Sequence, residues 1–393
     1  MQNVTVPYVV YQMTHSTTWL GLAAFMSFFP ALVIGPISGT LADRFSRKAI
    51  LLITQTIQMA VAFAFWGFWV AGELSPGNSL ALLLVYGVSA GINITSWQAF
   101  VPLLVPRDDL LDAVRLNSMQ FTGARAFGPA IGGVVLAQWG PATAFMGNAL
   151  SFLLVLAALA VVHERRVDTS GAAGRTVQQF REGLAYVRST TALWLPVVTM
   201  LMVSLLGSSL IQLAPAYATD QFHVGRAAYG FLVGMFGAGA FVGSIVIVAA
   251  GDRLARSRSA FAGLVLFAAG VIGLGLARSY AVGLVALLVM GVAYVTIAIS
   301  LNTSIQIRVP ERFRGRVVSI YLMSLLGGVP VGALVAGRIS DVIGLDVTTT
   351  ASGVALSAFV VLAVVRFSRM AALDETLEAV HEGDDAIASI TPP

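Results

Sequence analysis

Long apolar runs separated by short polar stretches fill almost the whole chain. A helix that spans a membrane needs about 20 predominantly apolar residues, and eleven runs of about this length are present. They are 19–41, 49–70, 80–104, 114–137, 142–162, 193–216, 229–250, 260–277, 280–299, 317–336 and 347–365. Because each run is long enough to cross a bilayer, the pattern predicts an all-α membrane protein.

The opening stretch, residues 4–11, is apolar but shorter than a span. A polar turn signal at 14–18 follows it directly. We therefore expect the stretch to be the outer half of a helix 1 whose first half is missing, and a complete helix would need roughly 10 to 15 further residues. A short re-entrant or surface segment is the alternative.

Composition excludes a soluble fold. The chain is 57% hydrophobic and 11% charged, against about 25% charged in soluble domains, and its mean hydropathy is +0.85. There is no cysteine, so disulfides and thiolate metal sites are excluded, and no cofactor is expected. The pI of about 9.6 does not indicate a nucleic-acid partner, because the basic residues are scattered between apolar runs and fit membrane sidedness better.

The basic residues gather at alternate turns. Of the 23 lysines and arginines, all but Arg125, Arg226, Arg278 and Arg338 lie on one side of the predicted membrane region. Cytoplasmic loops carry such an excess of positive charge. The arginine-rich side is therefore expected to be cytoplasmic, and the C-terminus with it.

A weak internal repeat suggests two related halves. Residues 39–48 form a charged turn between two apolar runs, and residues 250–258 form a weaker copy. Stretches 105–109 and 128–129 match 309–312 and 329–332 at nearly the same offset. Parallel repeats of this kind are a known transporter architecture.

One long connection, residues 163–192, separates the halves. Its beginning is small and polar, as in a linker, whereas Phe180, Leu184 and Val187 share one face of an amphipathic helix expected on the membrane surface. The polar, acidic end of the chain is expected to be mostly disordered. The expected domains are an N-terminal bundle (1–162), a cytoplasmic linker (163–192), a C-terminal bundle (193–367) and a cytoplasmic tail (368–393).

The charged turn at 39–48 resembles the signature between helices 2 and 3 of the major facilitator superfamily, which has a glycine, three residues, Asp-Arg and then basic residues. This resemblance implies two pseudo-symmetric six-helix bundles that transport by alternating access. Gly128, Pro129, Gly132 and Gly133 resemble the core of the helix-5 motif of exporters, although Ala124 stands where an upstream glycine is expected.

Three further stretches, 13–17, 180–183 and 309–317, resemble the branch that holds the enterobactin exporter and macrolide-efflux proteins. The branch implies a protein of the bacterial cytoplasmic membrane, which we expect to work as a monomer and to use protons as the coupling ion. Glu73, Asp220 and Asp341 all lie near outer helix ends. Proton coupling therefore follows from the resemblance alone.

The resemblance also assigns gating to the charged turns. The counterpart of Asp43 contacts the start of helix 11 in the outward-open state, here near residues 314–316, and Asp252 is expected to mirror it at helix 5. A carboxylate at a helix N-terminus gains about 0.3–1 kcal/mol from the macrodipole. Anchoring of the turns is the alternative. The expected gating residues are Gly39, Asp43, Arg44, Arg47, Asp252 and Arg253.

Arg125 is a basic residue that no helix end explains. Counted from residue 114 at about 1.5 Å per residue, it lies near the middle of a ~30 Å hydrocarbon core. A charge there costs several kcal/mol unless it faces a partner or water, and glycines on its stripe predict that it points inward. It either binds an anion or couples transport, or it is a structural arginine bonded to carbonyls and amides.

Neutral polar groups inside the runs are expected to turn away from lipid. With Arg125, the expected substrate-binding residues are Tyr8, Tyr11, Asn93, Gln98, Gln212, Tyr294 and Asn302. Each taken alone is better explained by helix packing, but the set predicts a large amphipathic cavity.

These features favour a secondary transporter that exports hydrophobic or amphipathic, drug- or macrolide-like molecules, and not an enzyme. The chain has no Walker-type glycine loop, which excludes an ATP-driven pump. A siderophore or another anionic metabolite, paired with Arg125, is the alternative substrate. A non-transporting membrane sensor or a degraded paralogue is the alternative from another class.

Overall fold

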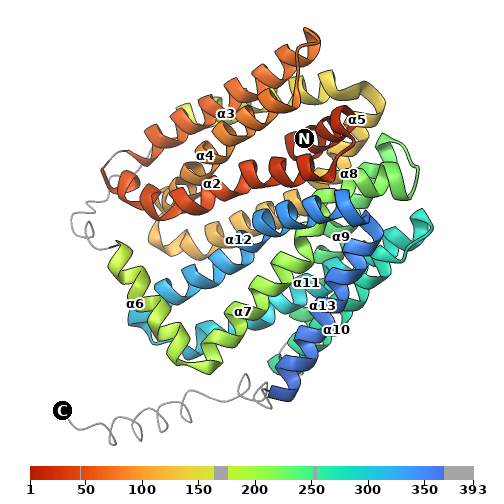
Figure 1. Ribbon diagram of the computed structural model, residues 1–393. Helices are drawn as coiled ribbons and strands as arrows, with labels where there is room; N and C mark the ends of the chain where they lie inside the picture. The colour runs from red at the N-terminus through yellow and green to blue at the C-terminus, as the bar shows by residue number, and fades with distance from the viewer. Residues whose placement is uncertain (45, 163–175, 251–254, 367–393) are drawn as a thin grey trace, which may run out of the picture.

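Two helical bundles make up the computed structural model, which describes residues 1–44, 46–162, 176–250 and 255–366. In Figure 1 the helices from α1 to α5 fill the upper part and those from α7 to α13 the lower part, with α2 and α12 side by side between them. The N-terminal bundle contains α1 (Gln2–Thr14), α2 (Thr17–Arg44), α3 (Arg47–Val70), α4 (Pro76–Phe100), the 3-10 turns η1 (Val101–Leu103) and η2 (Arg107–Asp109), and α5 (Leu110–Val161).

The C-terminal bundle begins with a broken helix and ends with five long ones. Its elements are α7 (Thr191–Leu206), η3 (Ser208–Leu213), α8 (Ala214–Ala216), η4 (Tyr217–Gln221), α9 (Arg226–Ala250), α10 (Arg256–Gly275), α11 (Tyr280–Arg308), α12 (Glu311–Ile343) and α13 (Leu345–Arg366). Helix α6 (Thr176–Ser189) stands between the bundles in the sequence. The described residues form no strand, which confirms the all-α expectation.

The eleven apolar runs coincide with helical structure, although ten helices of the described chain are long and apolar enough to span a membrane. The difference arises at α5, which contains both 114–137 and 142–162 and bends at Gly140, where φ is 78° and ψ is 177°. Glycine reaches positive φ without a steric penalty. Pro141 then starts the second arm of α5 with a helical φ.

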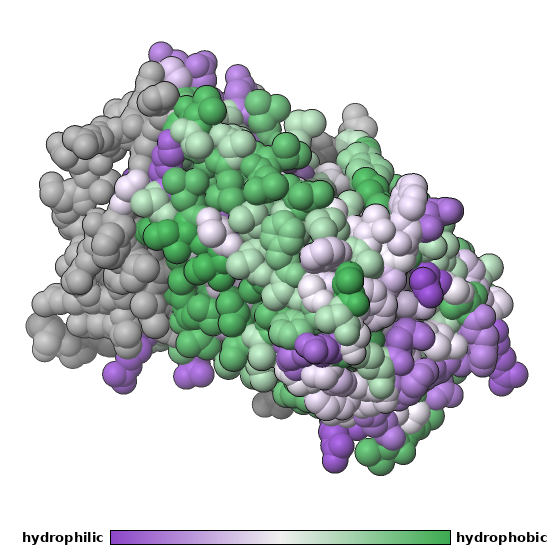
Figure 2. Space-filling model, turned by 90° about the horizontal axis from the view of Figure 1, so that it is seen from above, coloured by the Kyte–Doolittle hydropathy of each residue, from purple (hydrophilic) through white to green (hydrophobic). Residues whose placement is uncertain are grey.

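Large apolar side chains cover much of the outer surface, including Leu116, Met119, Leu154 and Val161. Figure 2 shows a green apolar area over the middle of one face, with purple hydrophilic side chains gathered towards the right of the view. An exposed apolar area of this extent marks a surface that lipid covers. The surface therefore agrees with a multi-pass membrane protein.

The run 193–216 is not one regular helix, contrary to the expectation from its hydropathy. Helix α7 ends at Leu206, and Gly207 has φ −126° and ψ −62°. The chain continues as the 3-10 helix η3, the single turn α8 and the π-helical turn η4. Irregular backbone at membrane depth is tolerated where it is buried in protein or lines a cavity, and π-helical turns are frequent at functional sites. The side chains of η3 are therefore candidates to line a cavity between the helices.

Helix α1 belongs to the core of the N-terminal bundle. It packs against α2, α4 and α5, and Val4, Val6, Val9 and Val10 are almost fully buried. The opening stretch is therefore a packed helix and not a surface segment.

Helix α6 is the expected amphipathic helix, but protein covers its apolar face. Arg316 Nη1 of α12 donates a 3.0 Å hydrogen bond to Glu182 Oε2. The Tyr186 ring stacks on Phe313 with centroids 4.7 Å apart, and Val187 is fully buried. Because these partners lie on α12 and its neighbours, α6 is fastened to the C-terminal bundle and does not lie free on the membrane surface.

Candidate functional site

The two bundles approach closely where glycines face each other. Helix α2 packs along α12, and α5 packs along α9. A Cβ atom on Gly133 would lie only 2.2 Å from the Gly230 Cα, and one on Gly21 only 2.5 Å from the Ala333 carbonyl oxygen. Small residues at such positions let backbones of neighbouring membrane helices touch. We call this contact between the bundles the seam.

The seam is closed at the end where α2 begins and α12 finishes, which we call the sealed end. Asp341, in the last turn of α12, accepts four hydrogen bonds from the start of α2. Its Oδ1 accepts from Thr17 N and Thr17 Oγ1, both at 2.7 Å, and its Oδ2 accepts from Ser16 Oγ at 2.5 Å and Thr18 N at 3.0 Å. Thr17 Oγ1 also lies 2.7 Å from the Gly337 carbonyl oxygen, to which it can donate.

Tyrosines close the sealed end between α1 and the C-terminal bundle. The Tyr11 hydroxyl donates to Asp220 Oδ2 in η4, and Tyr11 is 1% exposed. The Tyr229 hydroxyl donates to the Val4 carbonyl at 3.0 Å, and its ring stacks on Tyr8 with centroids 5.4 Å apart. Two of the tyrosines expected in the cavity, Tyr8 and Tyr11, therefore bridge the bundles.

A cavity lies beside this seal, between α1, α2, α4 and η3. Its volume is about 20 Å³, which is room for about one water molecule. It is lined by Gln2, Asn3, Val6, Pro7, Leu20, Ala23, Ala24, Ser27, Phe28, Leu83 and Gln212. The lining residues that the structure describes are apolar or neutral polar, so the cavity is amphipathic. Its small volume leaves no room for a larger molecule.

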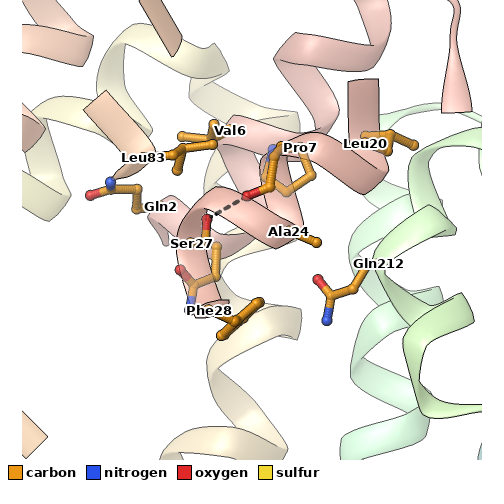
Figure 3. A pocket seen from close by; sticks show the side chains of 11 residues that line it. Gln2, Val6, Pro7, Leu20, Ala24, Ser27, Phe28, Leu83 and Gln212 are labelled. Carbon is orange, nitrogen blue, oxygen red and sulfur yellow. Dashed lines mark hydrogen bonds between the residues drawn. The ribbon is translucent and has the colours of Figure 1, made fainter. Parts of the chain in front are cut away.

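Gln212 is the expected site residue that reaches this cavity from the C-terminal bundle. Figure 3 shows its side chain extending from the broken helix towards Ala24 and Phe28 of α2. Across the cavity, Gln2 is 4% exposed, and its Oε1 accepts a 3.1 Å hydrogen bond from Asn148 Nδ2. The Ser27 hydroxyl donates to the Ala23 carbonyl at 2.7 Å. Amide groups from both bundles thus face one small amphipathic space.

The other expected substrate-binding residues lie elsewhere in the bundles. Asn93 Nδ2 donates to Thr54 Oγ1 at 2.9 Å, which joins α4 to α3. Gln98 is exposed. The Tyr294 ring lies 5.6 Å from that of Phe236, and Asn302 Oδ1 accepts from Gln306 Nε2 at 3.1 Å. The structure does not bring these four side chains to the cavity beside the seal.

The expected gating residues belong to the opposite, arginine-rich end. The structure describes only the backbone of Gly39, Asp43, Arg44 and Arg125, and Asp252 and Arg253 lie wholly outside the described residues. Arg47 is half-buried in the first turn of α3. Lys48 donates to the Ala160 and Val162 carbonyls at 3.0 and 2.6 Å, so this part of the turn ties α3 to the end of α5.

The glycines of the helix-5 motif face two different helices. Gly133 meets Gly230 of α9, whereas Gly132 faces Met1 and the first turn of α1 at Val4. Gly128 has nothing within 4 Å of its Cβ position, and Pro129 lies inside α5. Half of the motif therefore builds the seam and its immediate support.

Sequence reasoning missed three groups at this site: Gln2 and Asn3, Gly230, and the pairing of Asp341. Gln2 and Asn3 are polar and precede the apolar stretch, so hydropathy does not include them in it. Gly230 begins the series of small residues in α9, which the sequence does show. The partners of Asp341 lie more than 320 residues away, and no local pattern connects them.

The fold is that of major facilitator transporters. A variant of the nucleoside transporter NupG superposes with a TM-score of 0.74 at 12% identity, covering 93% of this chain and 94% of that one. A D-xylose-proton symporter gives a TM-score of 0.71 at 14% identity, covering 91% and 93%. These likenesses concern the arrangement of helices.

The family model of the transmembrane secretion effectors matches residues 1–386, so the chain belongs to this family of major facilitator transporters. Among curated relatives, the enterobactin exporter EntS of Shigella boydii serotype 18 is 27% identical over 376 residues, which cover 90% of this chain and 84% of the relative. The chain is therefore a multi-pass membrane transporter related to exporters.

Proposed function

We propose that this transporter exports hydrophobic or amphipathic small molecules across the bacterial cytoplasmic membrane by alternating access. The observation that carries the proposal is the amphipathic cavity between the bundles, closed on one side by contacts that cross the seam. By the positive-inside rule the arginine-rich end is cytoplasmic. The sealed end then faces outward, and the conformation is closed to the outside.

The lining favours a substrate with an apolar body and neutral hydrogen-bonding groups. Apolar side chains from α1, α2 and α4 supply most of the wall, and amides of Gln2, Asn3 and Gln212 supply the polar contacts. Pockets of this kind recognise ligands by apolar contact and orient them with a few polar groups. Since the cavity holds about one water, a larger substrate requires the bundles to separate.

The experiment that tests export is the accumulation of a fluorescent amphipathic dye in cells that express the chain, with and without a protonophore. Lower accumulation that the protonophore reverses supports proton-coupled export. Unchanged accumulation of dyes and of a catecholate siderophore would remove the export proposal and favour a non-transporting role.

Gln212→Leu is expected to raise the half-saturating dye concentration about 2- to 13-fold, because one neutral hydrogen bond contributes about 0.5–1.5 kcal/mol. Dye efflux at several concentrations measures this change. The matched control is Gln12→Leu, since Gln12 is an exposed amide on α1 that does not line the cavity. Equal effects of the two variants would contradict the role of Gln212.

A siderophore is the second candidate substrate, and the relative from Shigella boydii favours it because that relative is an enterobactin exporter. A catecholate siderophore is anionic, so its export would need a cation in the transport path, for which Arg125 in the first arm of α5 is the candidate. Arg125→Gln is then expected to abolish siderophore export, with Arg125→Lys retaining part of it. Siderophore secretion measures the effect. Equal secretion by both variants and the unmodified chain would exclude Arg125 as the cation that pairs with the substrate.

A further inference from the structure

Asp341 of α12 caps the N-terminus of α2, although a helix is usually capped by the residue that precedes it in the chain. The first N–H groups of an α-helix have no partner inside the helix, and a serine, threonine or aspartate just before the helix usually accepts from them. At the start of α2, Ser16 Oγ instead donates to Asp341 Oδ2. The N–H groups of Thr17 and Thr18 donate to the same carboxylate. The cap of α2 is therefore supplied by the other bundle.

The chemistry of this contact suits a seal that must open. Hydrogen bonds to a carboxylate are stronger than those between neutral groups, and the positive end of the α2 dipole adds to them. Asp341 is nevertheless exposed at the surface, so water can replace its partners when α2 and α12 separate. Below it, the Thr17 hydroxyl also lies within 2.7 Å of the Gly337 carbonyl oxygen, and Gly21 faces the backbone at Ala333. The Asp341 carboxylate thus lies at the outer end of the α2–α12 contact and holds that end together.

We infer that Asp341 is a positioning residue for alternating access: its four hydrogen bonds to Ser16, Thr17 and Thr18 hold the seam closed at the sealed end, and their loss shifts the protein towards the conformation open at that end. This inference rests on the proposed transport by alternating access. It concerns the balance between two conformations and is independent of which molecule is carried.

The absence of cysteine in the sequence makes the balance measurable with single reporters. Leu20, which is 1% exposed and lies in the seam near the sealed end, is replaced in the outer reporter, Leu20→Cys. Gln306, exposed at the arginine-rich end, is replaced in the inner reporter, Gln306→Cys. Each reporter is labelled with a membrane-impermeant maleimide from its own side, in right-side-out or inverted membrane vesicles, with and without a change at Asp341.

With Asp341→Ala, the labelling rate is expected to rise at least 5-fold in the outer reporter and to fall in the inner reporter. Asp341→Asn retains one acceptor oxygen, so it is expected to give a smaller shift in the same directions. Thr17→Val removes a hydroxyl that reaches α12 but keeps the N–H donor, so on its own it is expected to give a smaller shift than Asp341→Ala in the same directions. The matched control is Asp346→Asn, an exposed acid in the first turn of α13 at the same end.

Opposite changes at the two ends distinguish the closing role of Asp341 from a loss of folding, which would raise labelling at both ends. An unchanged rate in the outer reporter when Asp341→Ala is added, or a rise in both reporters, overturns the inference. Labelling needs no substrate. A rise in the outer reporter and a fall in the inner one, without any dye or siderophore export, would therefore support the role of Asp341 and reject the export proposal. Export of dye or siderophore with unchanged labelling of both reporters would support the export proposal and reject the role of Asp341.

Discussion

Export by the Gly133→Ala variant is expected to fall about 5- to 150-fold, although only one methyl group is added. That methyl would lie 2.2 Å from the Gly230 Cα, and backbone cannot move aside as the end of a flexible side chain does. Forcing extra carbon into a packed contact costs typically 1–3 kcal/mol, which corresponds to about that range of populations. Dye efflux from cells with matched protein levels measures the loss.

Gly123→Ala is the control for this change. Gly123 also lies in α5, and nothing stands within 4 Å of its Cβ position. Alanine is favoured over glycine inside a helix by about 0.5–1 kcal/mol, so both variants should keep α5 at least as stable as before. Equal export by the two would show that the seam between α5 and α9 does not need to close during transport.

Gly239→Val is expected to lower the amount and the melting temperature of the protein itself. A Cβ on Gly239 of α9 would lie 2.1 Å from the Leu288 carbonyl oxygen, and one on Gly291 of α11 would lie 2.1 Å from the Phe236 carbonyl oxygen. These glycines join two helices of the same bundle, so a side chain disrupts the packing in every conformation. The cost of overpacking is again at least about 1–3 kcal/mol.

The melting temperature of the detergent-purified protein measures this effect. Gly273→Ala is its control, because the nearest atom to a Cβ there is the Ala286 Cβ at an ordinary 3.9 Å. A Gly239→Val protein with the same melting temperature as the unmodified chain would contradict the close α9–α11 contact. Together the two glycine variants separate a contact between bundles, which controls transport, from a contact within a bundle, which controls stability.

Hydropathy was sufficient to locate the spanning helices, because lipid requires long apolar segments whatever their partners. It could not reveal the break after Leu206: residues 193–216 are apolar throughout, and a 3-10 segment has the same composition as an α-helix. Gly207, the serine pair after it and Pro215 were the available signals, but each also occurs in unbroken membrane helices.

The site was predictable only where one residue carries its own signal. Gln212 stood out as an amide inside an apolar run, and it does line the cavity. Asp341 could be placed near a helix end but not paired, because its partners belong to the opposite bundle. Asn93 looks the same in sequence as Gln212, yet it bonds to Thr54 within its own bundle. Tertiary neighbours, which composition does not encode, decide between these outcomes.

The attachment of α6 to α12 also offers a practical handle for imaging. A transporter of 41.2 kDa that lies mostly in lipid gives single-particle microscopy little to align. Glu182 and Tyr186 hold α6 against Arg316 and Phe313, while Arg181 and Ala185 are exposed on its other side. An antibody fragment raised against this side would move rigidly with the C-terminal bundle, and its angle to the micelle would report each conformation that the transporter adopts.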